Sequence, residues 1–277
     1  MSELTDFIIE NGVLKEYVGQ SSEVIIPDNV ESIGSHAFYN CDSLIKVIIG
    51  DSVVKIGDHA FQRCESLETV VIGNNVKEIE ECAFTECASL MYLTIGNKVE
   101  NIGVLAFSEC SSLTSVEIPD SVLNIGEAAF EDCVYLIKIV IPNNVLNIGE
   151  GVFQYCKMLK SVIIGEGVKN ISEFAFDGCT SLTNVEVGKN VTIIEDCAFS
   201  NCTALTNISI PSNVKSIGDS AFFKCTSLTS IRITDNVTSI GEEAFYKCKK
   251  LIIEAPSNTC AEKYAKQNKI KFKEIFL

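Results

Sequence analysis

A period of 23 residues constrains the fold of this chain more than any other feature of its 277 residues. Phenylalanine recurs at this spacing from Phe38 to Phe245, and cysteine follows it three residues later, from Cys41 to Cys248. Leucine comes three residues after each cysteine, and no insertion or deletion breaks the register in ten copies. A period this regular is typical of a solenoid, in which each residue packs on its own copy in the next coil.

Each copy contains two extended segments. Leu44, Val47 and Ile49 follow the pattern L-x-x-V-x-I, and the alternation of the last two predicts a strand that points them inward. Pro or Gly followed by Asp or Asn then predicts a turn, and Val-x-x-Ile-Gly predicts a second short extended piece on the opposite side. Ala-Phe-x-x-Cys-x-x-Leu, with apolar residues three apart, predicts a single helical or 3-10 turn. We therefore expect a mostly β coil, with a parallel sheet on one face and turns on the other.

The whole unit resembles the BspA-like (Treponema-type) leucine-rich-repeat family. It reads L-x-x-[VI]-x-[IV]-[PG]-x-x-V-x-x-I-G-x-x-A-F-x-x-C-x-x from about Val24 to Leu251. The resemblance implies a leucine-rich-repeat solenoid, a horseshoe or superhelix, of about ten repeats over residues 23–250. Residues 1–22 resemble the hairpin cap that opens such arrays, and residues 251–277 resemble their helix-plus-strand terminator. We expect the three parts to form one continuous domain.

The resemblance also implies a function. Members of this family are typically surface or secreted adhesion and ligand-binding proteins, so we expect a non-catalytic module that binds a protein, such as a host or cell-surface protein. The alternative is an intracellular scaffold for protein–protein interaction, because the segment MSELTDFIIENG lacks the positive region and cleavage site of a signal peptide. Localisation thus stays open between the cell surface or secretion and the cytoplasm. We expect a monomer.

Charge argues against two other classes of partner. The formal net charge is −15, yet eight lysines and only three glutamates follow position 246, which gives that end +5 and the rest of the chain −20. A body this acidic repels phosphate backbones and anionic lipid, so nucleic acid is not an expected partner. No apolar run approaches the roughly 18 residues of a membrane span, so membrane insertion is not expected either.

The partner-binding face is predicted from two outward positions of the first strand, which vary while the core positions do not. Ile25, Ile48 and Val71 occupy one of these positions in three successive copies, which favours protein contact. The alternative is that β-branched residues merely favour strands. The predicted face comprises Ile25, Lys46, Ile48, Val71, Tyr92, Thr94, Glu117, Val140 and Ile163.

Ten of the thirteen cysteines share one column of the repeat, which places neighbouring ones about 5 Å apart on adjacent coils. Cysteine packs well as a small apolar residue, and the C-x-x-C spacing of zinc sites does not occur in the sequence. We predict buried, unpaired thiols, which suit a reducing environment.

One further column invites a metal. His36, His59 and Cys82 occupy it in successive copies, and together they offer a soft divalent metal up to three ligands. The interpretation that we favour is a variable column, because it continues with Leu105 and Ala128. We therefore predict no metal site and no cofactor.

The column just before it is almost entirely acidic. A ladder of carboxylates is one way to collect Ca²⁺. The interpretation that we favour is that each acid caps the helical turn beginning at Ala-Phe, since capping explains why the acid recurs. Its members are Asp58, Glu81, Glu127, Glu150, Glu173, Asp196, Asp219 and Glu242.

Catalysis is not expected. A serine or cysteine nucleophile needs a base nearby, and the two histidines share one column. In most repeats a glycine follows isoleucine as a turn former, and no glycine-rich phosphate-binding loop occurs in the sequence.

Overall fold

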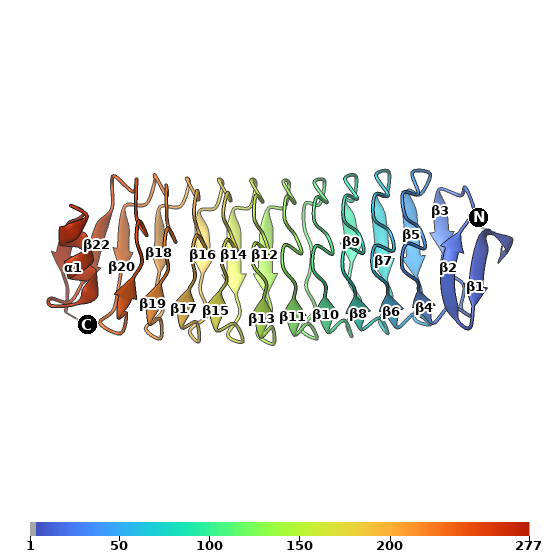
Figure 1. The fold of residues 1–277 in the computed structure, drawn as a ribbon, viewed down its shortest axis with the longest axis horizontal. Helices are drawn as coiled ribbons and strands as arrows, with labels where there is room; N and C mark the ends of the chain where they lie inside the picture. Colours follow the sequence, from blue (N-terminus) through green and yellow to red (C-terminus); the bar gives the residue numbers. More distant parts are fainter. Residues whose placement is uncertain (1–3, 277) are drawn as a thin grey trace.

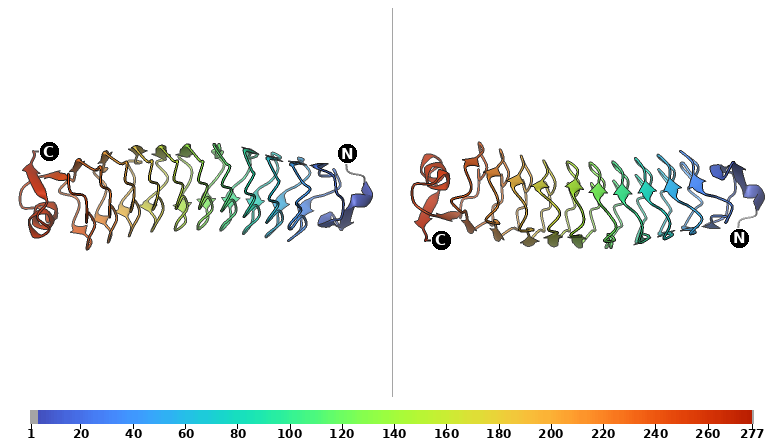
Figure 2. Two further views of the ribbon diagram at one scale, coloured as in Figure 1. Left: turned by 90° about the horizontal axis from the view of Figure 1, so that it is seen from above. Right: turned by 90° about the horizontal axis from the view of Figure 1, so that it is seen from below.

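The chain forms an elongated solenoid, as the 23-residue period predicts. The structure is a computed structural model that describes residues 4–276. Successive coils stack along one axis, and the two ends of the chain lie at opposite ends of the rod (Figure 1). Views from above and below show a gradually twisting rod that does not close into a horseshoe (Figure 2).

The first strand of each repeat builds the sheet that we name the front sheet. Its strands pair in parallel with equivalent residues side by side, as Lys46 lies opposite Thr69 and Val47 opposite Val70. The alternation predicted for these strands is confirmed, because Val47 and Ile49 are buried. The strands form three hydrogen-bonded groups: first β3 (Glu23–Ile25), β5 (Lys46–Ile49), β7 (Thr69–Ile72) and β9 (Tyr92–Thr94); then β12 (Lys138–Ile141), β14 (Ser161–Ile164) and β16 (Asn184–Glu186); and last β18 (Asn207–Ser209), β20 (Ser230–Arg232) and β22 (Ile252–Ala255).

The second extended piece also pairs from coil to coil, so the expectation of a sheet on one face only was incomplete. This back sheet consists of two-residue strands in parallel register, with Ile33 opposite Ile56. Short pieces suffice because the inner strands are hydrogen-bonded on both sides by their own copies, although the pairing is interrupted between residues 147–148 and 170–171. Its strands are β4 (Ser32–Ile33), β6 (Lys55–Ile56), β8 (Glu78–Ile79), β10 (Asn101–Ile102), β11 (Asn124–Ile125), β13 (Asn147–Ile148), β15 (Asn170–Ile171), β17 (Ile193–Ile194), β19 (Ser216–Ile217) and β21 (Ser239–Ile240).

The turn around Ala-Phe is not helical, so the predicted helical or 3-10 turn was wrong. Two residues of each coil, four apart, hold positive φ, as His36 (61°) and Asn40 (56°) do in the first copy. Their amides point along the rod: His36 N–H donates to the Asp58 carbonyl (3.1 Å) and Asn40 N–H to that of Gln62 (2.8 Å). Amides between them close tight turns inside the coil, as Tyr39 N–H does on the His36 carbonyl (3.0 Å). Alternate amides thus bond to the next coil, and the positive φ angles keep the turns from continuing as a helix.

The acidic column consequently has no helix to cap, and the capping interpretation was wrong. Two of its carboxylates bridge coils instead. Asp196 Oδ1 accepts the backbone N–H of Asp219 (2.7 Å), and Asp219 Oδ1 accepts that of Glu242 (2.7 Å). In these coils the acid stabilises the stacking of one coil on the next.

Ten stacked phenylalanines form the centre of the core. Ring centroids of neighbouring coils lie 4.6 Å apart for Phe38 and Phe61 and 5.6 Å apart for Phe153 and Phe176. These rings are almost completely buried. The distances are those of favourable aromatic pairs, so the repeat converts one phenylalanine per coil into a continuous stack.

Both ends of this stack are closed by tyrosines from the terminal segments. At the N-terminal end, η1 (Leu4–Asp6) leads into an antiparallel hairpin of β1 (Phe7–Glu10) and β2 (Val13–Tyr17). Tyr17 stacks on Phe38 at 4.9 Å. At the other end, Tyr264 of α1 (Cys260–Gln267) meets Phe245 edge-on at 5.8 Å, and β23 (Lys271–Glu274) extends the front sheet beside β22.

Candidate protein-binding face

Eight of the nine residues of the predicted face lie on the outer side of the front sheet. The ninth, Glu117, lies in the coil after β9, where no strand forms on this face, and none of the nine is buried. The strands alternate because Val47, Val70 and their equivalents point into the core, which leaves the residues between them facing outward. The most exposed apolar members are Tyr92 (66%) and Ile25 (62%), followed by Val140 (41%). The face is rigid backbone with varied side chains, a suitable base for recognition.

Ile48 and Val71 are half-buried, unlike Ile25. Both lie opposite each other in β5 and β7 with a strand on either side, whereas Ile25 lies on the terminal strand β3. Neighbouring side chains therefore cover part of the methyl surface of Ile48 and Val71. The apolar row Ile25–Ile48–Val71 lies on the surface, and its most exposed residue is at the β3 end.

A second group of exposed apolar residues was only partly anticipated. Tyr135 and Ile137 precede β12 and are exposed together with Val140 of that strand. Sequence reasoning selected Val140 and overlooked the other two. The available signal was the column of Tyr135, which holds serine at positions 43, 66, 89 and 112 and changes abruptly to tyrosine and then to Met158.

The front face is also hollowed between β9 and the following coil. A groove of about 450 Å³ lies there, with Leu93, Thr94 and Ile95 on one side and Glu117 and Asp120 on the other. Thr94 and Glu117 belong to the predicted face, but the groove itself was not predicted. The residues of this coil keep the repeat pattern, so nothing in the sequence indicates that its backbone parts from β9.

The candidate metal ligands do not converge. The His36 and His59 rings stack face to face with centroids 4.8 Å apart. His36 Nδ1 is hydrogen-bonded to Ser35 Oγ (2.8 Å) and His59 Nδ1 to Gln62 Oε1 (2.9 Å). Within residues 4–276 no group of three His, Cys, Asp or Glu side chains is placed to hold a metal ion.

The cysteines form a ladder whose role goes beyond filling space. Each thiol of the repeated column from Cys64 to Cys248 donates a hydrogen bond to the phenylalanine carbonyl of the preceding coil, as Cys64 Sγ does to Phe38 (3.0 Å) and Cys133 Sγ to Phe107 (3.3 Å). Burial raises the pKa of Cys64 to about 12 and shifts that of Cys133 in the same direction. The thiols whose pKa is raised by burial therefore stay protonated near neutral pH and are poor nucleophiles. At the end of the ladder, the contact with Cys225 lowers the pKa of the Cys248 thiol.

Taken together, a coil of two parallel sheets and an aromatic stack defines a β-solenoid of the leucine-rich-repeat class. The sequence profile described as "BspA type Leucine rich repeat region (6 copies)" matches residues 8–137 and 124–252. The chain belongs to this family. A search of curated proteins found no match.

Two solved structures support the same fold, and a third is similar to this chain over nearly its whole length. The chain is 26% identical to the T. pallidum leucine-rich repeat protein TpLRR, with 74% of this chain and 90% of that one covered and a TM-score of 0.55. A leucine-rich repeat protein from Eubacterium ventriosum is 21% identical, with 85% and 88% covered and a TM-score of 0.55. One from Bacteroides ovatus is 26% identical, with 98% and 97% covered and a TM-score of 0.48.

Repeat proteins of this family are generally non-catalytic, and their fold suggests a protein-interaction module. Among the described residues, no helix combines the length and the apolar character needed to cross a bilayer.

Proposed function

We propose that this protein is a non-catalytic binding module that holds a protein partner on the N-terminal half of its front sheet. The observation that carries the proposal is the pair of widely exposed apolar side chains, Ile25 and Tyr92, at the two ends of β3–β9. Between them lies the half-buried row of Ile48 and Val71, beside Lys46. An aromatic anchor, aliphatic surface and a charged neighbour are typical of interaction hot spots.

The resemblance to BspA-like proteins favours a surface or secreted adhesion role, in which the partner is a host or cell-surface protein. One observation favours the second candidate, an intracellular scaffold. All thirteen cysteines are free thiols, with ten of them fully or almost fully buried. Unpaired thiols in this number suit a reducing environment. A leader or anchor segment encoded upstream in the gene would decide for the surface role.

The experiment compares two aspartate variants in the same part of the rod. Ile25→Asp places a charge on the front sheet, where it should weaken partner binding at least about tenfold because a hot-spot contact is lost and a charge is desolvated. Val54→Asp makes the same change beside the back sheet, where Val54 is 45% exposed. It should leave binding unchanged.

Proteins captured by the immobilised wild-type array are quantified by mass spectrometry and then titrated against both variants. Each variant should melt within a few degrees of the wild type, because both positions are exposed. Loss of binding in Val54→Asp with retention in Ile25→Asp would move the partner to the back sheet and refute the proposal.

A further inference from the structure

The front sheet opens between β9 and the coil that follows it. In earlier coils the backbone hydrogen bonds from coil to coil are regular. The Ile45 carbonyl accepts the amides of Glu68 (2.8 Å) and Thr69 (3.1 Å). The Glu68 carbonyl likewise accepts the amides of Met91 and Tyr92 (both 3.0 Å). The Met91 carbonyl is next in this series. Over residues 4–276 it accepts no backbone amide.

The backbone amide at the end of β9 also lacks the partner that its equivalent has in the first coil. Ile26 N–H donates to the Ile48 carbonyl (2.9 Å), whereas Ile95 N–H, its equivalent, meets no backbone acceptor in the described chain. On the far side of the opening, Ser115 bridges only forward, to Lys138. Figure 1 accordingly draws no strand on this face between β9 and β12.

The other sides of the same junction stay closed. In the back sheet Asn101 pairs with Asn124. In the core the Phe107 and Phe130 rings stack at 5.4 Å, and the Phe107 amide donates to the Ala129 carbonyl (2.8 Å). Two coils joined at the back and parted at the front form a wedge, which is the groove of about 450 Å³.

The lining of the wedge is apolar at depth and acidic at its rim. Leu93 is half-buried, although its equivalents Val47 and Val70 are fully covered, so the opening exposes core surface. Glu117 and Asp120 are exposed on the opposite wall, and neither forms an ion pair within residues 4–276. A groove with apolar depth, two carboxylates and a free strand edge suits a side chain with a long methylene stem and a cationic head.

We propose that this wedge binds an arginine or lysine side chain of an extended basic segment in the partner protein. The inference rests on the proposed function, because it locates the partner on the same front sheet, beside the strand that carries Tyr92. Residues 1–246 carry a net charge of −20, which attracts a basic segment and repels an acidic one. The main chain of an extended segment also has the donors and acceptors that an open strand edge leaves unpaired.

The test uses two fluorescent peptides of equal length, one alternating valine with arginine and one alternating valine with glutamate. Fluorescence anisotropy should show the arginine peptide binding at least about tenfold more tightly at moderate ionic strength. The double variant Glu117→Gln with Asp120→Asn should lose that preference. The matched control, Glu23→Gln with Asp28→Asn, removes the same charge from the first coil of the same face and should keep it.

Equal binding of the two peptides would overturn the proposal, as would an equal loss in both double variants, which would show attraction to the overall charge alone. The Ile25→Asp variant separates this result from the proposed function. If Ile25→Asp abolishes partner binding while the arginine peptide ignores the wedge, the front sheet remains the binding face and only the wedge is refuted.

Discussion

At the scale of single residues, the turn around Ala-Phe in each coil requires an unusual backbone conformation at two positions. Leu105 (φ 54°) and Phe174 (φ 53°) share a column with His36, and every member of this column holds a positive φ. Side chains other than glycine resist this region because Cβ approaches the backbone. Neither of the two repeat positions with positive φ ever holds valine, isoleucine or threonine. These β-branched residues tolerate a positive φ least, so their absence reflects the backbone constraint.

Two adjacent alanines test the constraint with opposite expected signs. Ala128 has φ 50°, so Ala128→Gly should relieve strain and raise the free energy of unfolding by up to about 1 kcal/mol. Ala129 is fully buried and lies outside the positive-φ columns, so Ala129→Gly should lower it by roughly 1 kcal/mol. Urea denaturation measures both. A loss of stability in both variants would contradict the role assigned to residue 128.

The cysteine ladder is a second residue-scale feature, in which each buried thiol satisfies a carbonyl of the preceding coil. Serine would donate there too, but a hydroxyl is costlier to bury than a thiol, and alanine would donate nothing. Cysteine is both apolar and a weak donor, which explains why one residue type recurs in every coil.

Thiol titration tests the ladder. Cys41, Cys197 and Cys260 are half-buried, so at most these three should react quickly with a thiol reagent in the native protein, and all thirteen after denaturation. Burial raises the pKa of Cys64 to about 12, so its stabilising contribution is complete below the ordinary thiol pKa of about 9. The free energy of unfolding should therefore fall as pH rises from about 9 towards 12. Rapid reaction of most thiols in the native state would show that the ladder is open.

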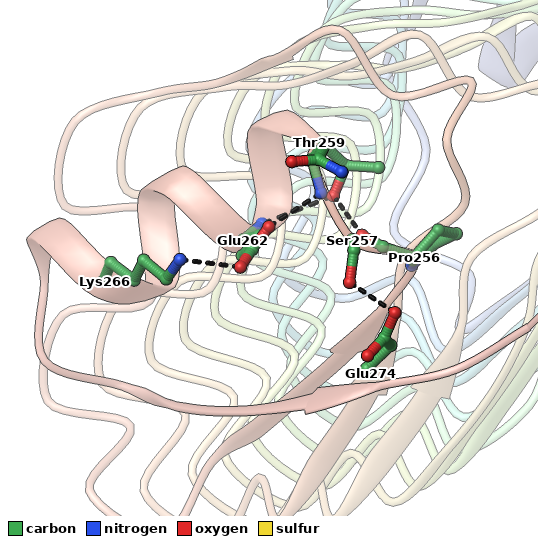
Figure 3. Close-up of polar contacts among 7 residues, drawn as sticks. Pro256, Ser257, Thr259, Glu262, Lys266 and Glu274 are labelled. Atoms are coloured by element: carbon green, nitrogen blue, oxygen red, sulfur yellow. Dashed lines mark hydrogen bonds and ion pairs between the residues drawn. The ribbon is translucent and has the colours of Figure 1, made fainter.

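At the scale of elements, the C-terminal helix is begun by local hydrogen bonds. Thr259 Oγ1 accepts the Glu262 amide (3.4 Å), and Glu262 accepts the Asn258 amide (2.7 Å) and pairs with Lys266 (2.7 Å), as Figure 3 shows. This arrangement resembles a capping box. It holds α1 where Tyr264 covers the last phenylalanine of the stack.

Thr259→Ala should destabilise α1 by about 1 kcal/mol, because the first turn loses its acceptor. Since coils contact only their neighbours, hydrogen exchange should speed up in α1 and the last coils and stay unchanged at the N-terminal end. Ser257→Ala, which removes only the exposed hydrogen bond to Glu274, is the control and should have little effect. Uniformly faster exchange along the rod would contradict this local role.

At the scale of the whole molecule, the rod combines an acidic body with a basic end. Lys273 pairs with Glu254 within the terminal segment, and Arg63 pairs with Glu86 across two coils. These pairs are largely exposed, so they contribute little to stability. The larger consequence of the charge is for association, where a net −20 over residues 1–246 speeds the approach of a basic partner at low salt.

The sequence alone determined the solenoid, its coil length and its core. The unbroken register from Phe38 to Phe245 means that each residue stacks on the equivalent residue of the next repeat. The alternation of apolar residues, such as Val47 and Ile49, identifies the side of the front sheet that faces the core. The outward residues of the candidate face followed from the same alternation. These inferences succeed because periodicity is a local property that is repeated ten times.

Only the tertiary structure decided how coils bond to one another. The positive φ of His36 and Asn40 arises because their amides find acceptors in the next coil, whereas a single repeat read by itself favours a helical turn. The wedge beside Leu93 has the same origin, since the spacing of two coils results from contacts on all sides of the rod at once. Hydrogen bonds 22 or more residues apart leave no mark on local propensity, so the sequence predicts the coil and not the gap between coils.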